Sequence, residues 1–123
     1  MDTLSRPIIL CVDDEPVQLI VRELVLSSAG YTVITASTAD EAMDVFRGRQ
    51  VDLVITDHLL PGRTGVEMAA DMKKLRPEIR IMLVTGMPDL TADMEHIDRC
   101  FLKGSPTREF LAHVEELTMR HQS

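Results

Sequence analysis

Five residues with charged or hydroxyl side chains stand at the ends of short apolar runs. They are Asp13 and Asp14 after IILCV, Asp57 after VDLVIT, Thr85 closing IRIMLVT, and Lys103 after CFL. Carboxylates that lie within a few ångströms of one another repel unless a cation neutralises them. If the fold brings these side chains together, the sequence predicts a cation site with an ammonium and a hydroxyl beside it.

The residue types in this set favour magnesium over zinc. Cys11 and Cys100 do not form a CxxC pair, and no spacing of metal ligands occurs among His58, His96, His113 and His121. We expect these histidines at the surface, where His58, next to Asp57, could tune the site. Oxygen donors with few protein ligands suit Mg²⁺, which keeps several waters and serves phosphate chemistry.

Asp57 is the best candidate for a nucleophile in such a site. It stands alone at the end of its run, and a Pro-Gly turn follows and exposes it. A carboxylate can attack phosphorus and form an aspartyl phosphate, and phosphoryl transfer needs mainly alignment and neutralisation of the phosphoryl oxygens. The Lys103 ammonium and the Thr85 hydroxyl would each stabilise one of those oxygens.

Each of these residues also has a simpler interpretation. The alternatives are helix capping for Asp13 and Asp14, a solvated loop position for Asp57, a plain strand position for Thr85, and a plain surface position for Lys103. We expect Glu15 to be the acid at the start of the following helix, outside the site, because its charge is favourable at a helix N-terminus.

A regular alternation of strand and helix patterns would bring the five residues together. Short apolar or β-branched runs, typical of buried strands, occupy 8–12, 31–36, 51–56, 79–85 and 100–102. Helical patterns follow them at 16–29, 38–48, 66–75, 90–97 and 106–117. This order predicts an α/β fold with a parallel sheet, whose strands carry ligand sites at their carboxyl ends.

Two of the helical patterns make detailed predictions. The first contains an apolar stripe at i, i+3, i+4, i+7 and i+8, formed by Val17, Ile20, Val21, Leu24 and Val25, and such a stripe normally faces the core. The second opens with TADE, which matches a capping box with Thr38 as the N-cap residue.

Composition limits the class of protein. The chain has 123 residues, 45% of them apolar and 3% aromatic, so we expect a single domain over 1–123 with an aliphatic, methionine-rich core. The formal net charge of −7 argues against nucleic acid or an anionic membrane as a direct partner. We expect Cys11 and Cys100 to be small core residues in a reducing compartment. Without a signal peptide or a membrane span, a cytoplasmic location is expected.

Four motifs in order resemble the receiver domain of two-component response regulators over essentially the whole chain. They are CVDDE, VITDHLLPGRTG with its D-x-x-x-P-x-x-x-G pattern, LVTG, and FLKG. The resemblance implies a flavodoxin-like (CheY-like), doubly wound, five-stranded parallel sheet of order 2-1-3-4-5. It also implies five helices, and the fourth should be short or irregular because the segment 85–103 is shorter than usual.

The same resemblance implies a function in phosphorelay signal transduction. Asp57 would accept a phosphoryl group from a sensor histidine kinase or a histidine phosphotransfer protein, and a protein-binding surface would then switch. Asp14 and Asp57 would bind Mg²⁺ directly with the backbone carbonyl of Leu59, and Asp13 mostly through water. Thr85 would be the switch hydroxyl and Lys103 the phosphate-binding lysine. Such a chain is a signalling phosphoacceptor that catalyses only its own modification and slow dephosphorylation.

Besides the short segment 85–103, two departures from the family pattern concern the switch, and two apolar residues bear on the lifetime of the phosphoryl group. Cys100 stands where the family usually has an aromatic residue, and Gly104 replaces the usual proline after the lysine, with Pro106 displaced. Leu59 and Met87, two residues beyond Asp57 and Thr85, offer no polar group to position an attacking water. We therefore expect slow hydrolysis of the phosphoaspartate.

Two other functions are alternatives to this one. A receiver-like adaptor that works without phosphorylation would explain the missing aromatic residue and the short fourth helix. A phosphatase of the haloacid dehalogenase type would need a second aspartate two residues after the first, where Leu59 stands, and a cap domain that this chain lacks. The sequence therefore disfavours the phosphatase.

Overall fold

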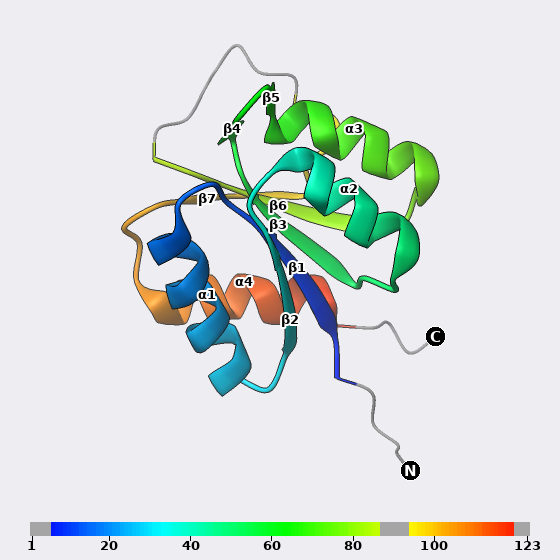
Figure 1. Cartoon of the computed structure of the whole chain (residues 1–123). Coiled ribbons are helices and arrows are strands. Elements are labelled where there is room, and N and C mark those ends of the chain that lie inside the picture. Colours follow the sequence, from blue (N-terminus) through cyan, green and yellow to red (C-terminus); the bar gives the residue numbers. More distant parts are fainter. Residues whose placement is uncertain (1–5, 87–93, 120–123) are drawn as a thin grey trace.

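A five-stranded parallel sheet forms the centre of the molecule, in the order β2-β1-β3-β6-β7 (Figure 1). The computed structural model describes residues 6–86 and 94–119. The strands of the sheet are β1 (Ile8–Val12), β2 (Thr32–Ala36), β3 (Leu53–Asp57), β6 (Arg80–Thr85) and β7 (Arg99–Leu102). A separate antiparallel hairpin consists of β4 (Leu59–Leu60) and β5 (Arg63–Thr64). Counted along the chain within the sheet, this is the predicted order 2-1-3-4-5.

Of the helices in the described residues, two cover each face of the sheet. Those described are α1 (Pro16–Ser28), α2 (Ala39–Gly48), α3 (Gly65–Leu75) and α4 (Thr107–Thr118). Figure 1 shows α2 and α3 on one face and α1 and α4 on the other. Of the predicted helix at 90–97, residues 90–93 lie outside the described residues, and 94–98 contain a turn at 95–96 and a bend at 98 instead of a helix. None of the described helices has the length and apolar character of a membrane span.

The central strands are apolar on both faces because helices cover both. Successive residues of a strand point to opposite faces. In β1, Leu10 and Val12 belong to the core beneath α2 and α3, whereas Ile9 and Cys11 belong to the core beneath α1 and α4. This two-sided burial explains why the sequence reads as continuous apolar runs rather than as an alternating pattern.

Hydrogen bonds at the first turns define where α2 and α3 begin. The Glu41 amide donates to Thr38 Oγ1 (3.0 Å) as predicted, but the Glu41 carboxylate accepts from the Ser37 amide (2.7 Å) instead of closing the box. The reciprocal capping box is at α3. There the Glu67 amide donates to Thr64 Oγ1 (3.1 Å) and the Thr64 amide donates to Glu67 Oε1 (2.9 Å).

The apolar stripe of α1, which was expected to face the core, lies mainly on the outward face of the helix. The exposed fractions are 68% for Val17, 57% for Ile20, 50% for Val21 and 63% for Leu24. The buried residues of this helix are Arg22 and Leu26, and Val25 packs partly against the core. Because α1 has apolar residues on both faces, its periodicity does not identify the buried one.

The two cysteines differ in their surroundings. Cys11 is fully buried, as predicted, and burial raises the pKa of its thiol to about 12. The prediction for Cys100 is wrong, because this residue is exposed. It lies on β7, an edge strand on which Phe101 is the buried residue and packs edge-to-face against Phe110 of α4.

Candidate functional site

The carboxyl ends of four strands meet at one edge of the sheet. The parallel register sets Val12 of β1 beside Thr56 of β3, and Asp57 beside Val84 of β6. The backbone amide of Lys103, just after β7, donates to the Thr85 carbonyl (2.8 Å). The residues predicted to converge are therefore all brought to the same edge.

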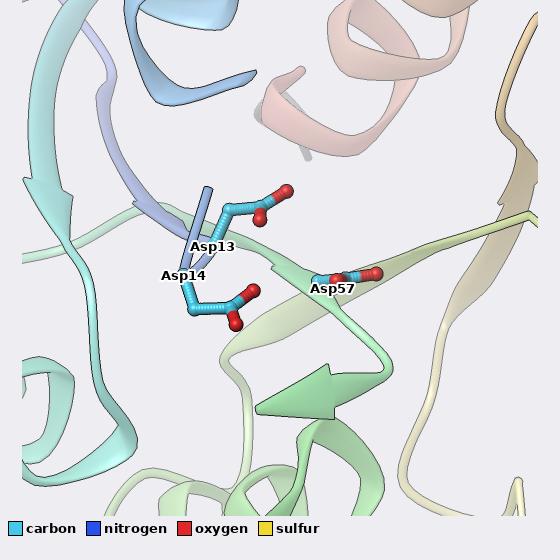
Figure 2. A group of neighbouring side chains, drawn as sticks. All are labelled: Asp13, Asp14 and Asp57. Atoms are coloured by element: carbon cyan, nitrogen blue, oxygen red, sulfur yellow. The ribbon is translucent and has the colours of Figure 1, made fainter. Parts of the chain in front are cut away.

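Three carboxylates form a compact cluster there. Asp13 and Asp14 extend from the end of β1 towards Asp57 at the end of β3 (Figure 2), and each side chain offers an oxygen within 4.8 Å of the others. Asp13 is fully buried and Asp57 is 9% exposed, whereas Asp14 is exposed to solvent. Solvent therefore reaches the cluster from the side of Asp14.

Two donors fix the carboxylate of Asp57. The Lys103 ammonium lies 3.2 Å from Asp57 Oδ1, and the backbone amide of His58 donates to the same oxygen at 2.9 Å. The Lys103 ammonium is only partly screened by water, because its side chain is 30% exposed. Lys103 thus lies beside Asp57 and is half-buried there.

A second cation, Arg22 of α1, also lies at the site and was not predicted from the sequence. Its Nη1 lies 3.0 Å from Asp13 Oδ2, and both side chains are at least nine-tenths buried. The other oxygen of Asp13 accepts the Glu15 amide at 3.0 Å. The only indication in the sequence is that Arg22 stands four residues before Leu26, so that both lie on the same face of the helix.

The remaining predicted residues lie around this cluster. Glu15 is the N-cap residue of α1, so neither Asp13 nor Asp14 caps the helix. Thr85, at the end of β6, is buried, and the Leu59 side chain is 68% exposed. His58 is buried, contrary to the surface position predicted for it, because it joins β3 directly to the β4–β5 hairpin.

The donors of the cluster match a hard divalent cation. Within residues 6–86 and 94–119, Asp13, Asp14 and Asp57 are the one group of three or more potential metal-ligating side chains, and all of their ligand atoms are oxygen. The charges of Lys103 and Arg22 offset two of the three negative charges and leave one in excess. A site with carboxylate ligands and access to water fits Mg²⁺.

Close backbone packing fixes the far side of Asp57. The Gly65 amide, at the start of α3, donates to the His58 carbonyl (2.6 Å). A Cβ atom at Gly65 would lie 2.3 Å from the backbone oxygen of Asp57 and 3.1 Å from Cγ2 of Thr56. The glycine therefore allows α3 to begin directly against the strand end that carries Asp57.

A pocket of about 250 Å³ opens between α1 and the segment that connects β7 to α4. Arg22 and Lys103, the two cations of the site, are among its lining residues, together with Val25 and Phe110. The pocket therefore borders both the acidic cluster and the exposed stripe of α1.

Sequence comparison agrees with this architecture. The family model described as the response regulator receiver domain matches residues 9–114. The chain belongs to this family. A curated relative is the transcriptional regulatory protein GlrR of Escherichia coli, which is 34% identical over 87 residues, or 68% of this chain and 20% of that protein. The receiver domain thus spans about a fifth of the length of the curated relatives that it matches.

Solved structures resemble this receiver domain along nearly its whole length. The response regulator TrrA of Thermotoga maritima, in complex with Mg²⁺–BeF, has a TM-score of 0.85 and 31% identity, covering 90% of this chain and 98% of that one. TrrA in complex with the histidine kinase ThkA has a TM-score of 0.84 and 30% identity, covering 92% and 99%. A receiver domain of an HD domain-containing protein of Pseudomonas fluorescens has a TM-score of 0.88 and 31% identity, covering 96% and 91%.

The contact at Gly65 gives a first prediction. Gly65→Ala should lower the free energy of unfolding by about 1–3 kcal/mol, because the added methyl group displaces the Asp57 backbone from a packed position. Urea denaturation measures the change. Gly48→Ala, at the end of α2, is the matched control, because a Cβ atom there meets nothing within 4 Å. Equal stability of the two variants would contradict the role given to Gly65.

Proposed function

We propose that this receiver domain accepts a phosphoryl group on Asp57 in a Mg²⁺-dependent reaction and thereby switches a protein-binding surface. The observation that carries the proposal is the position of Asp57. Its Oδ1 atom lies 3.2 Å from the Lys103 ammonium, and its carboxylate is within 4.8 Å of two further acids. This combines a nucleophile, a fixed cation and a cation-binding cluster.

The residues of the chain would divide the work of the transfer. Asp57, held by the His58 amide and Lys103, would attack phosphorus while the bond from phosphorus to the imidazole nitrogen of a phosphohistidine, or to the acetate oxygen of acetyl phosphate, breaks. Orientation supplies much of the catalysis in phosphoryl transfer. Lys103 would stay with the phosphoryl oxygens as negative charge builds up on them. The Thr85 hydroxyl would bind another of these oxygens. Asp14 and Asp57, with the Leu59 carbonyl, would hold Mg²⁺, which would neutralise phosphoryl charge.

Phosphorylation would change the electrostatics of the site. The acyl phosphate carries about 1.5 to 2 negative charges at neutral pH in place of the single charge of the carboxylate, so the site gains up to about one negative charge. In the unmodified site, two cations face three carboxylates, so the added charge has to recruit new donors. Thr85, at the end of the neighbouring strand β6, is in position to respond. Movement of the Thr85 hydroxyl would transmit the effect of phosphorylation away from Asp57. The aromatic residue that the family usually has at position 100 would not be needed for this.

The exposed stripe of α1 would be the docking surface for the phosphodonor protein. Val17, Ile20, Val21 and Leu24 are each at least half exposed, and contiguous apolar surface of this kind marks interaction sites. Val21 also lines the pocket beside Lys103, so a protein bound on α1 would reach the acidic cluster. The crystallised complex of TrrA with a histidine kinase supports a kinase as the kind of partner.

The central experiment is intact-mass analysis after incubation with acetyl phosphate and Mg²⁺. We expect one phosphoryl adduct on the parent chain and none on Asp57→Asn. Asp44→Asn is the control, since the Asp44 side chain is 83% exposed and lies outside the cluster. A folded parent chain without an adduct would instead favour an adaptor that works without phosphorylation.

The lifetime of the adduct depends on the residue at position 59. The apolar, exposed Leu59 side chain offers no hydrogen bond to an attacking water, so Leu59→Asn should speed dephosphorylation at least about threefold. That gain lies well below the roughly 100-fold contribution of a positioned general base. The decay of the adduct followed by mass measures the rate. Equal decay in parent and variant would refute the explanation.

A comparison of two phosphodonors, a histidine kinase and acetyl phosphate, distinguishes a role of α1 in docking from a role in phosphoryl transfer itself. Ile20→Glu should lower kcat/KM for transfer from an autophosphorylated histidine kinase about tenfold or more, the effect of losing one central apolar contact. Acetyl phosphate should modify the variant at the parental rate. Leu75→Glu, which alters an exposed leucine at the end of α3, is the control. Equal loss in both variants would exclude α1 as the specific surface.

A further inference from the structure

The position of Arg22 inside the fold calls for an explanation. Its side chain is 9% exposed, on the face of α1 that packs against the sheet. Removing a guanidinium from water costs several kcal/mol unless a partner of opposite charge is well placed. That partner is Asp13, which is completely buried and 3.0 Å away. A hydrocarbon side chain at this position would fill the space at lower cost.

The contacts of Asp13 indicate what the pair does. One carboxylate oxygen accepts the Glu15 amide at 3.0 Å, and the other accepts Arg22 Nη1 at 3.0 Å. An arginine side chain remains charged at any pH at which the protein is folded. The charge of Asp13 is therefore offset within the protein, independently of any bound metal.

We propose that Arg22 is a positioning residue that neutralises Asp13 as a resident cation and thereby weakens the affinity of the acidic cluster for Mg²⁺. The inference rests on the proposed function, since it concerns the metal site of that reaction. Asp14 and Asp57 are left as the carboxylates available to the metal. Arg22 also lines the pocket that Lys103 borders, so two fixed positive charges lie beside the cluster.

Direct measurement of Mg²⁺ binding tests this role. The probe is MgCl₂ titrated into ¹⁵N-labelled protein, and the dissociation constant is obtained from the shifts of backbone amide resonances. Arg22→Met keeps an unbranched side chain about as long as the aliphatic part of arginine and removes the charge. We expect it to bind Mg²⁺ about tenfold more tightly, because a nearby positive charge no longer repels the ion. Arg22→Lys, which keeps the charge, should stay within about threefold of the parent.

The matched control is Arg63→Met. Arg63 also pairs with an aspartate, Asp71, at 2.7 Å, but this pair lies outside the acidic cluster. Its loss should leave Mg²⁺ affinity unchanged. Unchanged or weaker binding in Arg22→Met would overturn the inference, and so would equal tightening in the Arg63 control.

A double variant tests the inference even if Arg22→Met fails to fold with Asp13 left unpaired. Asp13→Asn combined with Arg22→Met removes both buried charges, a replacement that is often neutral for stability. We expect its Mg²⁺ affinity to stay within about threefold of the parent, since the two charges offset each other. A loss of tenfold or more would show that Asp13 supports the metal despite Arg22. The phosphoryl adduct on Asp57 is scored separately, so either proposal can fail alone.

Discussion

The side chains of Asp13, Asp14 and Asp57 each present an oxygen within 4.8 Å of the others, at an edge of the sheet where two of the three are almost fully buried. At such distances like charges repel strongly unless water or a cation screens them. The fold offsets part of this repulsion with Lys103 from the end of β7 and Arg22 from α1. The two cations come from different elements, so the charges of the site link α1 and the end of β7 to the ends of β1 and β3.

The sheet and the main residues of the site could be predicted because both follow from short local patterns. Apolar runs marked the five strands, and each polar residue that ended a run had to appear at the same edge once the strands were parallel. The start of α2 followed from its first turn for the same reason, since Thr38 is its N-cap residue as predicted. In each of these cases the information lies within a few neighbouring residues.

The predictions failed where the outcome depends on packing between distant segments. Nothing local distinguishes the two apolar faces of α1, and the position of Arg22 depends on Asp13 nine residues earlier. Cys100 was expected in the core because its neighbours are apolar, but an edge strand buries only one of its faces. The burial of His58 depends on the β4–β5 hairpin, which brings the chain back to start α3 against β3.

The stripe on α1 has a consequence for how the helix is seated. A helix with aliphatic side chains on opposite faces gains similar hydrophobic energy in more than one rotation about its own axis. The ion pair between Arg22 and Asp13 distinguishes these rotations, because turning the helix would leave a buried aspartate without its cation. One polar contact therefore selects the orientation of α1 and determines which aliphatic side chains are left for other molecules.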